Sequence, residues 1–236
     1  PRSTLFPYTT LFRSVAAIVL GPRVRYKKDV IAPSNIPYTF IGAALLWIGW
    51  FGFNAGSAVG ANGLAGSAFL VTNTAAAMAG ITWLVIEWIV NKKPSIIGAA
   101  SGVVAGLVAI TPAAGYVDVK AAIIIGIVVS ILCYIMVAII KKKLGYDDSL
   151  DAFGIHGVGG TWGAIATGLF ANPLINTFAA GPDTGKPAAG LFFGNAAQLG
   201  TQMLSILVAI GIAVVGTLII LFILKVTIGI RVEPQE

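Results

Sequence analysis

Charged residues are scarce in this sequence and make up only 10% of its 236 residues. A soluble globular domain carries roughly 25%, so the chain lacks the polar side chains that a surface in water needs. Hydrophobic residues make up 57%, and the mean hydropathy is +0.92. The composition excludes a soluble globular protein and predicts an integral membrane protein embedded in a lipid bilayer.

Cysteine and histidine occur once each, as Cys133 and His156. A lone cysteine excludes a disulfide framework and a thiolate metal cluster within the chain. We identify no nucleophile–base pair and no phosphate-binding loop, because the glycine-rich run from Gly157 to Gly160 lies inside an apolar segment instead of following a strand. The net charge of +6 comes from short cationic runs between apolar segments. We therefore expect no enzyme, no cofactor, no metal and no nucleic-acid partner.

The first fourteen residues differ in character from the rest. The stretch from Leu5 to Ser14 reads LFPYTTLFRS, which resembles a translated sequencing adapter, and position 1 is not Met. It has no long apolar centre, so it does not fit a signal peptide. We interpret residues 1–14 as an adapter artefact and residues 15–236 as part of a transmembrane domain.

Apolar segments alternate with short polar loops along the rest of the chain. Residues 15–20 are too few to span a bilayer and end at Gly21-Pro22, as the end of a longer helix would. Six longer segments follow, at about residues 36–58, 64–90, 95–113, 119–140, 148–171 and 196–228. The sequence predicts an all-α polytopic membrane protein with six full transmembrane helices plus the end of a seventh.

The basic residues of the loops predict the orientation. If the loops alternate sides, ten cations fall on one side: Arg23, Arg25, Lys27, Lys28, Lys92, Lys93, Lys141, Lys142, Lys143 and Arg231. Only Lys120 and Lys186 fall on the other side. Because Lys and Arg are retained in the cytoplasm, we expect the basic side and the C-terminus to be cytoplasmic, in a plasma or inner membrane.

Polar side chains at membrane depth mark functional candidates, because they are costly in lipid. His156 is flanked by glycines at every third position, which allow another helix to approach closely: Gly154, Gly157, Gly160 and Gly163. His156 is therefore either a histidine held in a helix contact or, as we favour, a residue of a pore or proton pathway. Asp148 and Asp151 stand at the start of the same helix, where carboxylates cap free N–H groups.

Three residues of the first full segment recur on one helical face: Trp50, Phe53 and Ser57. Aromatic faces attract small cations, and a serine hydroxyl can accept a hydrogen bond from ammonium. The spacing alone favours ordinary packing over a cation site.

Two runs resemble a known family. WIGWFGFNAGSA and DSLDAFGIHGVGGTWGAIATGLFANP are similar to the sixth and tenth transmembrane segments of the Amt/Mep/Rh ammonium transporters, and the resemblance continues from Val15 to about Val232. It implies a trimer of eleven-helix protomers, each with a narrow apolar pore for ammonium or ammonia. This chain would be the latter part of that fold.

The resemblance also assigns roles to the candidates. His156 resembles the second of two pore histidines, Phe53 one of two phenylalanines that close the outer mouth, and Ser57 the hydroxyl of the outer recruitment site. Trp50 lies on the same pore-side helix. Asp148 and Asp151 resemble acids at the cytoplasmic end of the histidine helix, with a structural or inner-vestibule role.

The rest of the family's pore lies outside this sequence. The first five helices are absent except for residues 15–20, so we expect the chain alone to be inactive. The family's cytoplasmic tail, which communicates with PII-type regulatory proteins, is also absent. An ammonium-sensing membrane receptor on the same scaffold is the alternative function, and a signalling domain after Glu236 in the complete gene would favour it.

Overall fold

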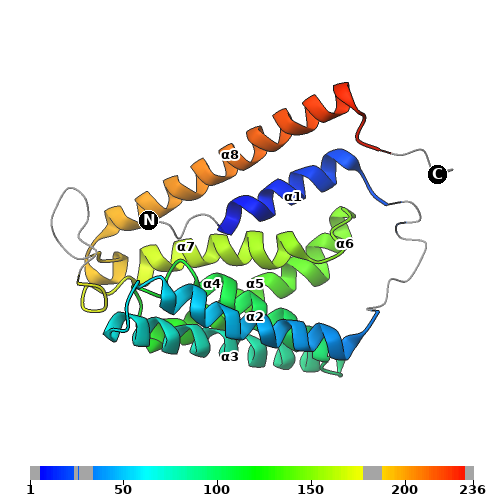
Figure 1. The fold of residues 1–236 in the computed structure, drawn as a ribbon. Helices are drawn as coiled ribbons and strands as arrows, with labels where there is room; N and C mark the ends of the chain where they lie inside the picture. Colours follow the sequence, from blue (N-terminus) through cyan, green and yellow to red (C-terminus); the bar gives the residue numbers. More distant parts are fainter. Residues whose placement is uncertain (1–5, 24–25, 27–33, 178–187, 232–236) are drawn as a thin grey trace.

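The computed structural model describes residues 6–23, 26, 34–177 and 188–231, and within these ranges the chain is helical, with no strand. Figure 1 shows an elongated bundle in which most helices run along one common direction. The elements are α1 (Phe6–Leu20), α2 (Ile36–Gly56), α3 (Gly63–Asn91), α4 (Ile96–Ile110), α5 (Val119–Ile135), the π-helical turn η2 (Met136–Ile140), α6 (Lys141–Leu144), the π-helical turn η3 (Phe153–Gly157), α7 (Val158–Phe170), the short 3₁₀ turn η4 (Leu191–Phe193) and α8 (Ala196–Thr227).

The helices follow the predicted apolar segments closely. Four helices in the described ranges are long and apolar enough to cross a membrane: Ile36–Gly56, Gly63–Asn91, Val119–Leu144 and Ala196–Thr227. The other two predicted spans are shorter: α4 has 15 residues, and the segment predicted at residues 148–171 forms η3 followed directly by α7, from Phe153 to Phe170. The all-α membrane fold is therefore confirmed, while the number of six full spans stays a prediction.

Side-chain caps determine where several helices begin. Asn35, Asn62, Ser95 and Asp118 each accept a hydrogen bond from the backbone N–H three residues further on, at the first turns of α2, α3, α4 and α5. These residue types are the preferred N-caps, because a short polar side chain satisfies an N–H that has no partner within the helix. The cap residue that precedes each apolar segment therefore sets the helix start.

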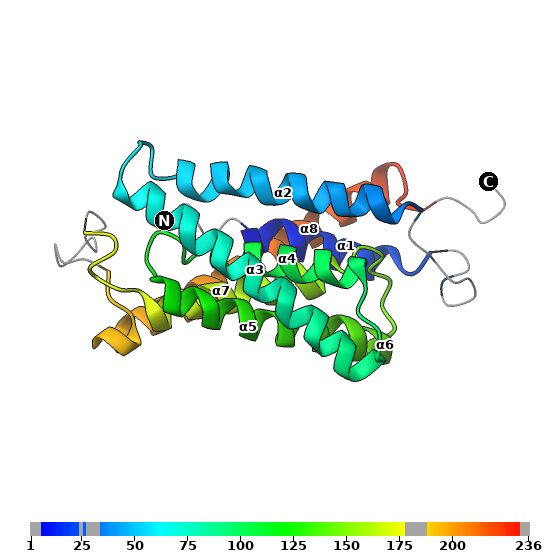
Figure 2. The same ribbon diagram turned by 90° about the horizontal axis from the view of Figure 1, so that it is seen from below.

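The loops gather at the two ends of the bundle (Figures 1 and 2). The end of α1, the start of α2, the α3–α4 loop, α6 and the end of α8 lie at one end. The cations of that set that the structure describes are Arg23, Lys92, Lys93, Lys141, Lys142, Lys143 and Arg231. Arg25, Lys27, Lys28 and Lys186 lie outside the described residues. The described cations of this set thus collect at one end, as the loop alternation predicts.

Small residues hold the centre of the bundle together. A Cβ added to Gly106 on α4 or to Gly126 on α5 would stand only 2.6 and 2.5 Å from the carbonyl oxygen of Ala75 on α3. Ser130 of α5 donates a hydrogen bond of 2.5 Å to the carbonyl of Ala79 on α3. Helices in lipid associate through such close contacts between small residues. Helices α3, α4 and α5 therefore form a tight central unit.

The remaining helices surround this unit. Helix α7 packs against α4 and α5 on one side and α8 on the other, and α1 lies against α8 and η3, as Figures 1 and 2 show. Helix α1 begins at Phe6, earlier than the predicted remnant at residues 15–20. Residues 6–14 contain no glycine, and their one proline, Pro7, stands in the first turn, where proline is tolerated, so this stretch can extend the helix whatever its origin.

Candidate functional site

Trp50 anchors the aromatic part of the site on α2. Its side chain is buried, and its Nε1–H donates a hydrogen bond of 2.7 Å to Oγ1 of Thr111, just after α4. Thr111 in turn donates to the carbonyl of Leu107 at 2.7 Å. The indole also packs against Leu107 and Val108. Trp50 is therefore held in one orientation by a neighbouring helix.

Phe53 lies one turn further along α2 and faces outward. Its ring meets the ring of Trp50 edge to face, with centroids 6.4 Å apart, and its side chain is 51% exposed. Both rings line an open, apolar groove of about 450 Å³ along α2, together with Gly42, Leu45, Leu46 and Gly49. The predicted aromatic pair thus exists as a ring contact beside a groove.

Ser57 follows the last residue of α2 and is exposed. Its hydroxyl donates a hydrogen bond of 2.6 Å to the carbonyl of Phe53. A hydroxyl that donates its hydrogen still offers two lone pairs, so Ser57 keeps the capacity to accept a hydrogen bond from a cation. Ser57 and Phe53 are therefore in direct contact, as their spacing predicts.

His156 lies in the π-helical turn η3, not in the regular α-helix that the sequence predicts from Asp148 onward. It is half-buried, between the buried residues Ile155 and Gly157. A π-turn inserts an extra residue per turn and is frequent at functional sites. Gly154 makes room for a second π-turn, η2, because a Cβ there would stand 2.6 Å from Cγ2 of Val137.

Asp148 and Asp151 precede the histidine helix instead of lying within its first turn, which corrects the predicted helix start. The Asp148 carboxylate accepts hydrogen bonds from the backbone N–H groups of Ala152 and Phe153 at 3.0 and 2.8 Å. It therefore caps the helix from outside. Asp151 adopts a left-handed backbone with φ of 51°, and its Oδ1 accepts a hydrogen bond of 2.6 Å from Nζ of Lys141.

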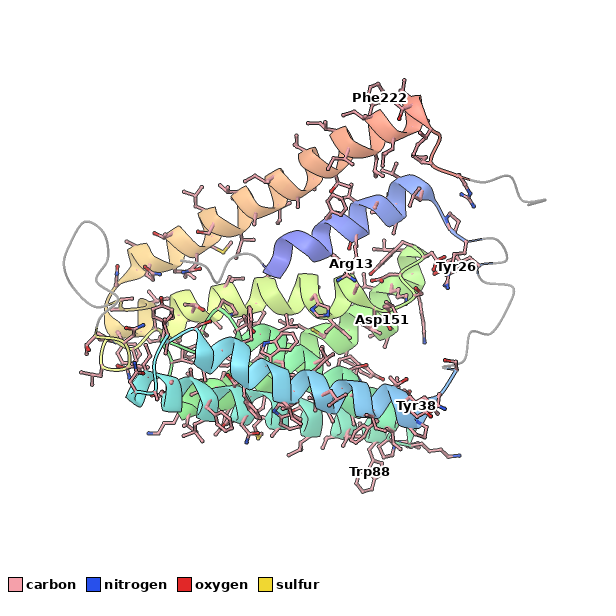
Figure 3. All side chains as sticks on the ribbon, viewed as in Figure 1. Arg13, Tyr26, Tyr38, Trp88, Asp151 and Phe222 are labelled. Carbon is pink, nitrogen blue, oxygen red and sulfur yellow. The ribbon has the colours of Figure 1, made fainter. Side chains whose placement is uncertain are left out.

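The site residues fall into two groups. Trp50, Phe53 and Ser57 lie toward the end of α2 that is opposite the basic end, whereas Asp148 and Asp151 lie at the basic end (Figure 3 labels Asp151). His156 follows the acidic pair into the bundle. Helix α4 contacts both α2 and α7, because its Val108 packs with Trp50 of α2 and also lies beside Gly159 of α7.

Two polar residues that the sequence reasoning did not select belong to this region. Asn54 is buried next to Phe53, and its Nδ2 donates a hydrogen bond of 3.0 Å to Oγ1 of Thr72 on α3. Thr111 holds the indole of Trp50. Both are polar residues inside apolar runs. Because a polar side chain is costly in lipid, this position in the sequence is a signal that could have identified them as site candidates.

Comparison with known proteins decides the family. A model of the Ammonium Transporter Family matches residues 12–236. The chain belongs to the ammonium transporter family. An ammonium transporter of Bacillus subtilis is 50% identical over 224 residues, which cover 94% of this chain and 52% of that protein. Ammonium transporter Amt1 of Archaeoglobus fulgidus is 48% identical over 221 residues, 93% of this chain and 53% of that protein.

Solved structures agree with this assignment. The crystal structure of Saccharomyces cerevisiae Mep2 has a TM-score of 0.88 at 34% identity, and the match covers 98% of this chain and 53% of that one. The structure of a protein named Sensor Amt Protein has a TM-score of 0.86 at 31% identity, and the match covers 99% of this chain and 56% of that one. The chain spans about half the length of the curated relatives it matches.

Proposed function

We propose that this chain is the C-terminal part of an ammonium transporter and supplies one wall of a narrow apolar path for ammonium or ammonia. The observation that carries the proposal is the family match over residues 12–236, combined with a single histidine placed inside an apolar helix. We further propose that the complete protein is a homotrimer of eleven-helix protomers, with the basic end and the C-terminus in the cytoplasm, and that a PII-type protein regulates it.

The proposed mechanism begins at the aromatic pair. Trp50 and Phe53 present ring faces and edges to the groove on α2, and an aromatic face attracts a small cation. Ser57, hydrogen-bonded to Phe53, offers an acceptor for an ammonium N–H. These three residues would hold the cation at the outer mouth.

The next step is loss of a proton. A bare cation pays heavily to enter a low-dielectric path, whereas neutral ammonia crosses it more easily. Histidine is suited to relay the proton, because its ordinary pKa of about 6.5 allows it to give and accept near neutrality. We propose that His156 takes this role with a second residue on the remainder of the protein, so the chain alone would be inactive.

A chimera tests this proposal. The N-terminal part of the Bacillus subtilis relative would be joined to residue Val15 and expressed in cells without ammonium uptake of their own. The chimera should take up labelled methylammonium, and this chain alone should not. His156→Ala should abolish uptake or its selectivity over potassium, whereas Thr201→Val, on the exposed surface of α8, should leave both unchanged. Unchanged uptake and selectivity in the His156 variant would refute the histidine's role.

A further inference from the structure

Polar contacts join three segments that are far apart in the sequence at the basic end of the bundle. Arg23, after α1, donates from Nε and Nη2 to the two carboxylate oxygens of Asp147, both at 2.7 Å, and its backbone N–H donates to Oδ2 at 2.9 Å. Tyr26 donates from its hydroxyl to the carbonyl of Tyr146 at 2.7 Å. We call these four residues the polar clasp. Figure 3 shows Tyr26 beside the segment that carries Asp151.

Hydrogen bonds from Arg231 also fix the segment that precedes Arg23. Arg231, after α8, donates from its two terminal nitrogens to the carbonyls of Leu20 and Pro22, at 2.8 and 2.7 Å. Carbonyls at a helix C-terminus have no partner within the helix, and the guanidinium satisfies that of Leu20, the last residue of α1, together with the carbonyl of Pro22 just beyond it. The residues just before Arg23 are therefore fixed in place, which gives the clasp a rigid base.

The other side of the clasp leads directly to the histidine helix. Asp148, next to Asp147, caps that helix through the N–H groups of Ala152 and Phe153. Lys141 fixes the same loop by donating to the carbonyl of Asp148 at 2.5 Å and to the carboxylate of Asp151. Eight residues separate Asp147 from His156, and the contacts above hold Asp148, Asp151, Ala152 and Phe153 among them.

The two partners of the ion pair differ in their exposure. The side chain of Asp147 is only 6% exposed, while that of Arg23 is 48% exposed. The hydrogen bond from the Arg23 guanidinium lowers the pKa of the Asp147 carboxyl group below its ordinary value. Two parallel N–H···O bonds also set direction and not only distance. Removal of Arg23 would leave a desolvated carboxylate without its main partner.

We infer that Arg23 and Asp147 are positioning residues that set the start of the histidine helix, and through it the place of His156. The effect of this contact on transport rests on the proposed function. Its effect on the start of the histidine helix does not depend on that function. The structure supplies a reporter for the start of that helix: Cys133 is the chain's only cysteine and is buried. Its Sγ lies 3.8 Å from the carbonyl of Ile155, the neighbour of His156.

The first experiment measures thiol labelling of Cys133 by a membrane-permeable maleimide in the 236-residue chain. Arg23→Asp and Asp147→Arg should each label about tenfold faster, because each change removes the bidentate hydrogen bonds of the pair and places two like charges together. The double variant restores the pair with reversed charges and should label at nearly the original rate. Lys93→Asp is the control for Arg23→Asp, because it makes the same charge change at the same end of the bundle but outside the clasp. It should label at the rate of the original chain.

The second experiment measures methylammonium uptake and its pH dependence in the chimera, at equal amounts of membrane-inserted protein. Each single variant should lower uptake about tenfold and shift the pH of half-maximal uptake, and the double variant should restore both. Singles with unchanged labelling and uptake would overturn the inference. So would a pH dependence that stays unchanged while uptake falls, or a double variant that restores nothing.

The two experiments separate the proposals. If labelling responds as expected but the original chimera transports nothing, the proposed function fails and the positioning contact stands. If the chimera transports but the clasp variants behave like the original protein in both assays, the inference fails and the proposed function stands.

Discussion

The hydrogen bond between Trp50 and Thr111 predicts an unequal pair of substitutions. Thr111→Val keeps the shape of the side chain but leaves the buried indole N–H without its acceptor, and such a group costs about 1–3 kcal/mol. Trp50→Phe removes the donor as well as part of the ring, so it loses a net hydrogen bond of about 1 kcal/mol plus packing. Once the indole is gone, Thr111→Val no longer strands a donor. The double variant should therefore cost about 1 kcal/mol less than the sum of the single variants.

The measurement is a double-mutant cycle on the midpoint of thermal unfolding in detergent micelles. For a chain of this size each 1 kcal/mol shifts the midpoint by about 2–4 °C. Thr217→Val provides the control, because Thr217 is also a buried threonine and its hydroxyl bonds only within its own helix in the described structure. The reasoning that Thr111 orients Trp50 would be refuted if the effects of the two single substitutions on the midpoint were additive. It would also be refuted if the coupling between them were no larger than that between Thr217→Val and Trp50→Phe.

Three further predictions follow from other contacts. Gly126→Ala should lower the unfolding midpoint, because its new methyl group meets a backbone oxygen of α3, whereas Gly216→Ala on α8 has open space and should leave it unchanged or raise it. Burial raises the pKa of the Asp151 carboxyl group above its ordinary 3.8, although the hydrogen bond from Lys141 opposes this shift. The contribution of Asp151 to the stability of the folded state is therefore fully present below pH 3.8 and is lost as the pH rises through the raised pKa. The unfolding midpoint of Asp151→Asn should therefore rise relative to that of the original chain as the pH increases through the raised pKa. A difference in midpoint that is the same at every pH would contradict burial as the cause. Glu87→Ala should cost about 1 kcal/mol in unfolding free energy, because the carboxylate accepts the backbone N–H of the residue that caps α4; a midpoint equal to that of the original chain would show that this contact contributes nothing.

Most of the fold could be predicted from the sequence, because long apolar segments between capped polar loops fix each helix locally. The segment predicted at residues 64–90 corresponds to α3 (Gly63–Asn91), and Asn62 starts it with a side-chain cap. The histidine helix was the exception. The sequence predicts that this helix starts at Asp148, but the left-handed backbone of Asp151 delays its start. Neither a left-handed residue nor a π-turn produces a pattern of apolar residues that would reveal it in the sequence.

The candidate site was predictable where its members are near in sequence. Trp50, Phe53 and Ser57 lie on one helical face, and the structure shows contacts within that set. Contacts between distant residues were not predictable in this way. Arg23 and Asp147 are 124 residues apart, and nothing in either local sequence indicates that one pairs with the other.

The central claim is that this chain forms part of an ammonium path. The most direct measurement is concentration-dependent uptake of labelled methylammonium by the chimera, with unlabelled ammonium and potassium as competitors. We predict saturable uptake that ammonium inhibits and potassium does not. Absence of uptake by a chimera that is shown to be inserted in the membrane, or uptake that potassium inhibits equally well, would contradict the claim.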